Sequence, residues 1–203
     1  MKPCALMSLK AFASFAIPPD ASRSNGLNAG PNAGSCLKVA HKRTNWLDAE
    51  EAQAITIRAA TGDDAPALTS IVRACAVQLG HYGSILRGYE VTRLQIERDQ
   101  IFVAFEGESL QGFYSLSNID AEPELELLLV GRQFQRTGVG SALFDHMCGR
   151  AREIGISRVK IIAHPPAWSF FERMGAMFAA AEAPSGRVTW ERHILAFDVI
   201  APG

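Results

Sequence analysis

The chain has 203 residues, of which 48% are hydrophobic and 20% are charged, and its formal net charge is −1. That size predicts one globular domain of about 150 residues together with an additional segment. The near-neutral charge gives no reason to expect nucleic acid or an anionic membrane surface as a partner, and no apolar run reaches the ~18 residues of a membrane span.

The first part of the chain differs in composition from the rest. Residues 18–36 are rich in Pro, Gly, Asn, Ser and Ala, a mixture that cannot form a core. Residues 1–46 hold six Lys or Arg and a single acid, Asp20, so a targeting peptide remains an alternative there. We predict a disordered or low-complexity leader over residues 1–53 and one domain over residues 54–203.

A strand and two helical regions open the predicted domain. Residues 54–60 alternate apolar and polar side chains, which indicates a strand. A helix with one apolar face follows, with Asp63 or Asp64 as its cap and Pro66 in its first turn. Residues 81–99 form a weaker helical region that two glycines interrupt.

The remaining elements complete an alternating pattern of strands and helices. In chain order we expect a hairpin over residues 100–119, a strand over 124–130, a helix from 140 to 155, a strand over 158–164, a helix over 166–175 and a strand over 191–200. This order predicts an α+β fold, with a mixed, mostly antiparallel central sheet flanked by helices.

The turn Gln135-Arg136-Thr137-Gly138-Val139-Gly140 joins the strand over 124–130 to the next helix. It lacks the lysine of a P-loop, and Leu143 stands where a dinucleotide fingerprint needs a third Gly or Ala. The first amides of a helix have no intrahelical partner and carry partial positive charge, and glycine lets a phosphate approach them. We therefore predict a pyrophosphate site made by backbone, with donors added by Gln135 and Arg136.

This turn resembles the Q/R-x-x-G-x-G/A coenzyme A motif of the GNAT family of N-acetyltransferases. A second segment adds to the resemblance, because Ala167, Phe170, Glu172 and Gly175 match the family's A-x-x-F-Y-E-x-x-G pattern. The resemblance implies the acyl-CoA N-acyltransferase fold. It also implies acetyl-CoA as the cofactor and direct attack of an acceptor amine on its thioester.

The same resemblance implies where the cofactor would bind. The loop amides and hydroxyls would hold the diphosphate, and the pantetheine arm would pair with strand backbone where two neighbouring strands splay apart. The strand amides would also stabilise the oxyanion of the tetrahedral intermediate. The expected cofactor-binding residues are Leu128, Val130, Gln135, Arg136, Thr137, Gly138, Val139, Gly140 and Ser141.

A general base is expected on the strand before the turn. An acceptor amine with a pKa of about 10.4 is mostly protonated at neutral pH, so a nearby base would help. Glu124 aligns with an acid that many family members carry, and Glu126 is the alternative. Alternation predicts that both acids lie on one face of the strand and that Leu125 and Leu127 lie on the other. The competing interpretation is that both acids are solvated on an exposed face of the sheet and have no catalytic role.

The general acid of the family is missing from this sequence. Phe171 stands in place of the tyrosine that would protonate the departing thiolate, and phenylalanine has no proton to donate. Water, Ser169 or His164 remain as donors, and His164 is our second catalytic candidate. A non-catalytic acyl-CoA-binding sensor on the same fold is therefore the main alternative function.

The acceptor is expected to be a small-molecule amine or a peptide amine. The resemblance places Tyr82, Tyr89 and Trp190 along the acceptor channel. Four further apolar residues could form an acceptor pocket, but their spacing favours the core, where we expect them: Phe170, Met174, Met177 and Phe178.

The cysteines give no indication of a metal site or a disulfide framework. Cys4, Cys36, Cys75 and Cys148 are scattered, form no C-x-x-C pair and have no clustered His beside them. They fit a reducing, cytoplasmic compartment, and the sequence leaves a homodimer open.

Overall fold

The computed structural model describes residues 55–199, so the leader predicted for residues 1–53 lies outside the described residues. The strands are β1 (Thr56–Ala59), β2 (Gln100–Glu106), β3 (Ser109–Ser117), β4 (Glu124–Val130), β5 (Arg158–Ala163), β6 (Met177–Glu182) and β7 (Arg192–Asp198). The α-helices are α1 (Ala65–Gln78), α2 (Arg93–Arg98), α3 (Val139–Glu153) and α4 (Trp168–Arg173). Short 3₁₀ helices are η1 (Gly62–Asp64), η2 (Tyr82–Leu86), η3 (Arg132–Phe134) and η4 (Pro165–Ala167).

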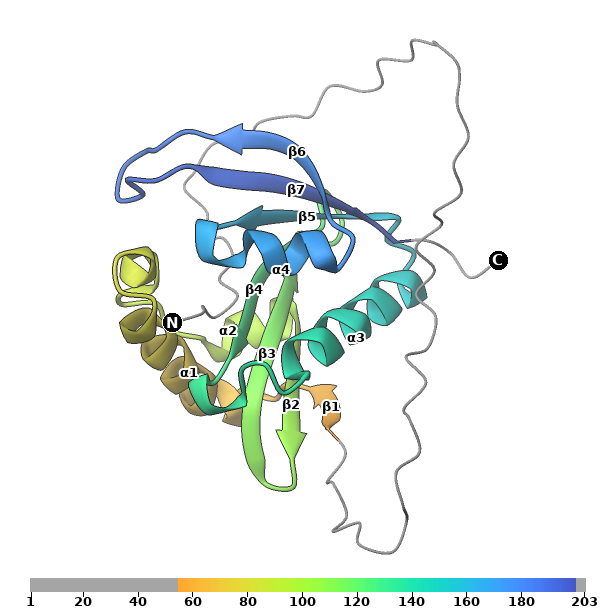
Figure 1. Ribbon diagram of the computed structural model, residues 1–203. Helices are drawn as coiled ribbons and strands as arrows, with labels where there is room; N and C mark the ends of the chain where they lie inside the picture. The colour runs from red at the N-terminus through yellow and green to blue at the C-terminus, as the bar shows by residue number, and fades with distance from the viewer. Residues whose placement is uncertain (1–54, 200–203) are drawn as a thin grey trace, which may run out of the picture. The chain divides into compact units, whose positions relative to one another are not determined.

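The strands form one seven-stranded sheet in the order β1-β2-β3-β4-β5-β7-β6 (Figure 1). All neighbouring strands are antiparallel except β4 and β5, which are parallel. The predicted α+β fold with a mixed, mostly antiparallel sheet is therefore confirmed.

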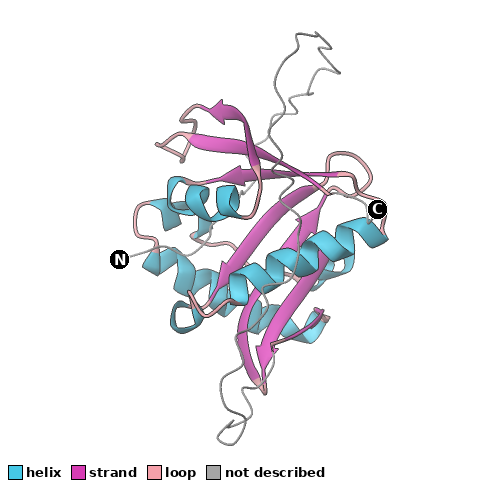
Figure 2. Cartoon of the chain, turned by 45° about the vertical axis from the view of Figure 1, so that its right-hand side comes forward, coloured by secondary structure: helices cyan, strands magenta, loops and turns pink. Residues whose placement is uncertain are grey.

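Helices pack on both faces of the sheet (Figure 2). Their apolar side chains form two clusters with the sheet. One cluster joins α3 and α4 to β4 through side chains that include Leu128 and Phe144. The other joins α1 and α2 to the opposite face of β4, where Leu127 and Leu129 meet Val72. Every residue of β4 is buried, as expected for a central strand that is covered on both faces.

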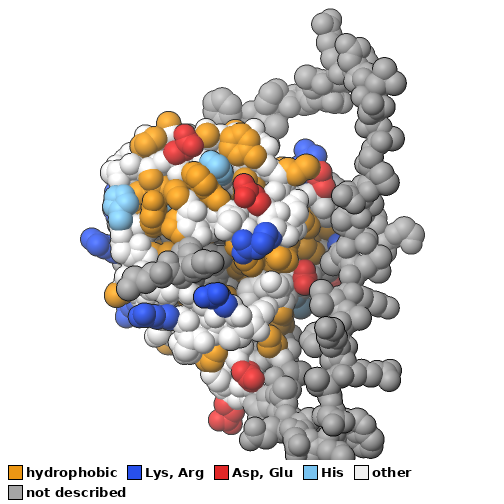
Figure 3. All heavy atoms as spheres, viewed as in Figure 1, with side chains coloured by type: hydrophobic (Ala, Val, Ile, Leu, Met, Phe, Trp, Pro, Cys, Tyr) orange, Lys and Arg blue, Asp and Glu red, His pale blue; other side chains and the backbone are white. Residues whose placement is uncertain are grey.

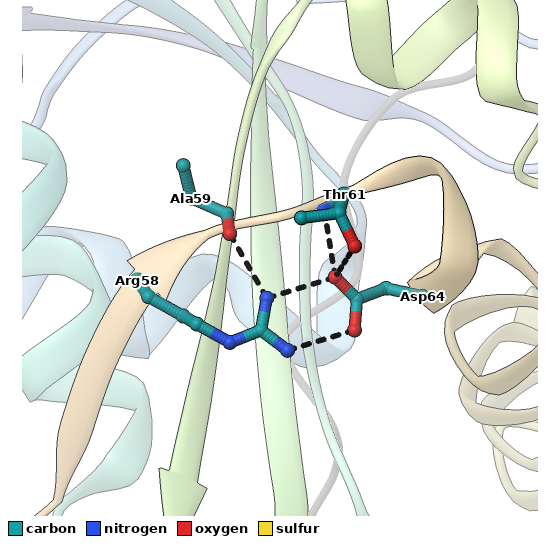
Figure 4. A network of polar contacts seen from close by, with 4 residues as sticks. All are labelled: Arg58, Ala59, Thr61 and Asp64. Atoms are coloured by element: carbon teal, nitrogen blue, oxygen red, sulfur yellow. Dashed lines mark hydrogen bonds and ion pairs between the residues drawn. The ribbon is translucent and has the colours of Figure 1, made fainter.

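A polar network fixes the entry into α1 (Figure 4). Arg58 Nη1 and Nη2 donate to the two carboxylate oxygens of Asp64 at 2.8 and 2.9 Å, and the Thr61 N–H donates to Asp64 Oδ2 at 2.7 Å. The hydrogen bond from Arg58, followed by the bonds from Thr61, lowers the pKa of Asp64 to about 2. Asp64, one of the two predicted cap residues, directly precedes α1, but its carboxylate accepts from Arg58 and Thr61 and makes no capping hydrogen bond to the helix; Pro66 lies in the first turn.

The edge strand β6 was not predicted, and two of its side chains correct our core assignment. Met177 and Phe178 are 56% and 57% exposed, whereas we expected both in the core. Figure 3 has the same view as Figure 1, and hydrophobic side chains gather at its top, where Figure 1 shows β6 and β7. Phe170 and Met174, the other two residues of that group, are partly buried against the α3–α4 cluster.

Within residues 55–199, no helix is both long enough and apolar enough to cross a membrane.

Candidate functional site

The sheet opens between β4 and β5. These two strands pair at a single position, Glu124 with Lys160, whereas every other neighbouring pair of strands is aligned over four or more positions. Beyond Lys160, β5 turns away from β4 together with β7 and β6 (Figure 1). The splayed strands that the family resemblance implied are therefore present, and they separate toward their carboxyl ends.

The turn after β4 presents backbone to the opening. Arg136 has φ 70° and Gly138 has φ 100°, so both lie in the left-handed region. Gly138 adopts this conformation without penalty, whereas a residue with a Cβ pays roughly 1–2 kcal/mol. The Ala142 N–H donates to the Gly138 carbonyl at 2.9 Å and closes the first turn of α3. The amides of residues 139–141 precede that bond and have no intrahelical acceptor.

A cavity of about 610 Å³ lies where β4 and β5 have separated. Small-molecule sites have volumes of about 300–1,000 Å³. One wall comes from the end of β4, the turn and the start of α3, and the other comes from η4 and α4. The lining residues are Val130, Gln135, Arg136, Gly138, Gly140, Ser141, Pro166, Ser169, Phe170 and Arg173.

Six of the nine predicted cofactor residues line this cavity: Val130, Gln135, Arg136, Gly138, Gly140 and Ser141. The other three are adjacent in the chain but contribute no side chain to the wall. Leu128 and Val139 are buried in the core, which fits a role through backbone alone. Thr137 Oγ1 donates to the Phe134 carbonyl at 2.7 Å, so its hydroxyl hydrogen is engaged within the turn.

Gln135 differs from our expectation that its side chain would donate to a phosphate. Its Nε2 donates to Gln78 Oε1 at 3.2 Å and to the Val130 carbonyl at 3.1 Å. A primary amide has two N–H hydrogens, and both are therefore engaged inside the protein. Gln135 lines the cavity with its donors turned to α1 and β4.

The cavity is basic. Arg136 and Arg173 line it from opposite walls, both are exposed, and its lining contains no acidic residue. The N-terminus of α3 adds partial positive charge. Sequence reasoning missed Arg173, although a signal was present: Ser169 and Arg173 are four residues apart and so share one face of α4.

The aromatic pair Phe170 and Phe171 occupies different places. Phe171 is fully buried and packs against Phe144, whereas Phe170 lines the cavity. The position that carries the family's tyrosine thus faces the core here. Within the lining, the hydroxyl groups belong to Ser141 and Ser169.

A β-bulge in β4 overturns the predicted strand faces. Ser115 pairs with Leu127, but its neighbour Leu116 pairs with Leu125, so Glu126 is an extra residue. Leu125 therefore packs in the α3–α4 cluster and Leu127 in the α1–α2 cluster. Our prediction that these two leucines share a face was wrong.

Both candidate bases are buried. Glu124 and Glu126 are 3% and 7% exposed, so the interpretation of solvated surface acids was wrong. Glu126 lies near Tyr89, whose pKa is raised by burial and then by the Glu126 charge. Glu124 lies at the closed end of the opening, roughly 20 Å along β4 from Val130 at about 3.3 Å per residue.

His164 follows β5 and is fully buried. Trp190 Nε1 donates to His164 Nδ1 at 2.7 Å, so in the neutral ring the proton is on Nε2. Burial, followed by the charge of Arg192, lowers the pKa of His164 to about 3. A ring with this pKa is neutral at pH 7 and is a weak proton donor, so the geometry gives no support to His164 as the general acid.

The three predicted acceptor-channel residues form two groups. Tyr82 on η2 meets Trp190 before β7, with ring centroids 5.1 Å apart, and His81 contacts both rings. Tyr89 lies apart from them and accepts a hydrogen bond from Gln95 Nε2. Among residues 55–199, no three His, Cys, Asp or Glu side chains gather in a way that could hold a metal ion.

Comparison with known proteins identifies the class. The family model described as Acetyltransferase (GNAT) family matches residues 68–176, which include the turn, the start of α3 and most of the opening. The chain therefore belongs to the GNAT acetyltransferase family. A search of curated protein sequences gives no match.

Solved structures share the fold at low sequence identity. The ribosomal-protein-S18-alanine N-acetyltransferase from Escherichia coli is 18% identical with a TM-score of 0.58, and the match covers 74% of this chain and 97% of that one. The PaiA N-acetyltransferase from Thermoplasma acidophilum, in complex with coenzyme A, is 19% identical with a TM-score of 0.59 and coverage of 71% and 99%. N-acetylglutamate synthase from Neisseria gonorrhoeae, complexed with coenzyme A and L-arginine, is 26% identical with a TM-score of 0.55, and the match covers 71% of this chain and 33% of that one.

Proposed function

We propose that the protein is an N-acetyltransferase that moves the acetyl group of acetyl-CoA to a primary amine by direct attack in a ternary complex. The observation that carries the proposal is the basic cavity at the end of the β4–β5 opening, with glycine backbone at its centre. The Thermoplasma and Neisseria structures hold coenzyme A on the same fold, which supports that cofactor here.

The diphosphate of the cofactor would bind at the amides of residues 139–141. Arg136 and Arg173 would add charge from the two walls. A Cβ on Gly140 would lie 3.6 Å from Phe170 Cε2 and 3.8 Å from Val130 Cγ2, so a longer side chain would project into the cavity. Glycine at this position keeps the amides within reach of the anion.

The pantetheine arm would run along β4 from Val130 toward Glu124. Ladder pairing with β5 does not extend to Leu128, so the facing edge of β4 can pair with the amide groups of the arm. The same strand amides would stabilise the oxyanion as the amine attacks the thioester carbon. The thioester would then lie toward the closed end of the opening.

Glu124 would act as the general base at that closed end. It would accept a proton from the ammonium form of the acceptor, directly or through water, and leave a neutral amine to attack. When the carbon–sulfur bond breaks, the thiolate of coenzyme A would take a proton from water, because Phe171 and His164 do not provide one and Ser169 lines the cavity that would hold the diphosphate.

The acceptor would be a small-molecule amine or a peptide amine. The Escherichia coli structure is named for a protein alanine, which supports a peptide amine as one class. We place the reaction in the cytoplasm, because Cys75 and Cys148 are not disulfide-bonded and reduced thiols are typical of that compartment.

The first test is turnover by the full chain with acetyl-CoA and a panel of amines: a diamine, an amino acid and a short peptide with a free N-terminus. Release of free thiol above the hydrolysis rate is expected with at least one amine. Glu124→Gln should lower kcat by about 10²-fold while acetyl-CoA affinity stays unchanged. Glu122→Gln, two residues earlier and bound to Lys160, is the matched control and should keep wild-type kcat.

Two outcomes would count against this proposal. Wild-type kcat in Glu124→Gln would remove Glu124 from the reaction. Binding of acetyl-CoA without turnover of any amine would favour a non-catalytic acyl-CoA sensor, the alternative that the buried Phe171 supports.

A further inference from the structure

The last residue of α1 is hydrogen-bonded to the first residue of the cofactor motif. Gln78 Nε2 donates to Gln135 Oε1 at 2.9 Å, and Gln135 Nε2 donates back to Gln78 Oε1 at 3.2 Å. Gln135 Nε2 also donates to the Val130 carbonyl. That carbonyl fixes the orientation of both amides, because a reversed Gln135 would set its own oxygen against an acceptor.

A second contact joins α1 to the same end of β4. Cys75 lies one helical turn before Gln78, and its Sγ donates to the Val130 carbonyl across 3.8 Å. Val130 therefore receives hydrogen bonds from both α1 and the turn. The two ends of the stretch from Val130 to Gln135 are held together against one helix.

The backbone beyond Gln135 needs such support. Residues 136–138 are exposed, and Arg136 holds a left-handed φ without being glycine. A residue in that conformation persists only where its surroundings fix it. If the turn were free to rearrange, ordering it on binding would reduce the affinity for the anion.

We infer that Gln78 is a positioning residue of the cofactor site, which holds Gln135 and through it the amides that bind the diphosphate. The inference rests on the proposed function, since it concerns binding of the same cofactor. Gln135 then acts on the cofactor through the shape of the turn, and the charge comes from Arg136 and Arg173.

The test is a double-mutant cycle on the full chain, with the dissociation constant for acetyl-CoA measured by isothermal titration. Gln78→Leu and Gln135→Leu should each weaken binding by about tenfold, the size of one lost hydrogen bond. The double variant should bind no more weakly than Gln135→Leu alone, because both changes remove the same amide pair. Gln133→Leu, which changes an exposed residue of η3 just before the turn, is the control and should bind as wild type does.

Hydrogen exchange of the ligand-free protein separates positioning from a general loss of stability. In Gln78→Leu, the Ala142 amide, which is hydrogen-bonded to the Gly138 carbonyl at the end of the turn, should exchange faster while the amides of β3 and β4 keep wild-type protection. If Gln78→Leu does not fold, Gln78→Met supplies a side chain of similar length for the same cycle.

The inference is overturned if Gln78→Leu binds acetyl-CoA as tightly as wild type, or if the effects of the two single variants multiply in the double variant. Failure of the proposed function looks different, because it appears in the wild-type protein itself, which would then either not bind acetyl-CoA or bind it without turnover of any amine.

Discussion

His164 illustrates how burial sets the charge of a single side chain. Its pKa of about 3 in the folded protein lies below the ordinary value of 6.5. Between these values the unfolded chain binds a proton that the folded chain does not. Stability that is present above pH 6.5 is therefore lost as the pH falls toward 3.

We predict that protonation of His164 in the unfolded chain lowers the free energy of unfolding by about 2 kcal/mol when the pH falls from 7.5 to 5.0. Urea unfolding of wild type and His164→Gln at both pH values measures this contribution. The pH-dependent drop should shrink by that amount in the variant. An equal drop in wild type and His164→Gln would show that the ring is protonated in the folded state.

Single residues differ in how far the sequence could place them. Arg136, Gly138 and Gly140 were predicted from one contiguous motif, because the chemistry of a helix N-terminus depends on neighbours in the chain. The faces of the sheet on which Leu125 and Leu127 lie were not predicted, because one inserted residue in a bulge reverses the alternation and leaves no pattern in the sequence. The pairing of Gln78 with Gln135 spans 57 positions and is set by tertiary packing.

At the scale of elements, two glycines differ in the space that the fold leaves for a side chain. A Cβ on Gly83 in η2 would lie 2.0 Å from the carbonyl oxygen of Ala76 in α1, so η2 and α1 meet at backbone distance. A Cβ on Gly149 in the middle of α3 would meet nothing within 4 Å. Gly83 is therefore needed for packing, whereas Gly149 only weakens its helix.

We predict that Gly83→Ala lowers the free energy of unfolding by about 2 kcal/mol, because backbone must move to admit the methyl group. Gly149→Ala should raise it by about 0.5–1 kcal/mol through helix propensity. Urea unfolding of the two variants beside wild type measures both changes. Wild-type stability in Gly83→Ala would contradict the close contact between η2 and α1.

The elements that the sequence predicted have strong local signals, and the missed ones depend on partners. The helix from Val139 to Glu153 has an apolar face and a glycine cap, and its prediction is confirmed. The strand β6 has the sequence MFAAAE, in which alanine favours helices and nothing alternates. It forms a strand because β7 pairs with it, and that pairing is a tertiary contact.

At the scale of the molecule, the site is a gap between two parts of one sheet. The order of elements was enough to predict a mixed sheet and, with two motifs, the family. The opening itself depends on β5 leaving β4 after one pair, which brings η4 and α4 opposite the start of α3. Pro166 and Arg173 enter the cavity for that reason, and the one local signal is the four-residue spacing of Arg173 from Ser169 on α4.

The central claim is that backbone at the start of α3 captures acetyl-CoA, and isothermal titration of the full chain tests it most directly. Wild type should bind acetyl-CoA with a micromolar dissociation constant and should not bind NAD. Gly140→Glu should abolish binding without unfolding the protein, because it places bulk and negative charge in the cavity. Gly149→Glu, the same substitution farther along α3, should bind as wild type does. Absence of binding by folded wild type, or equal affinity in Gly140→Glu, would contradict the claim.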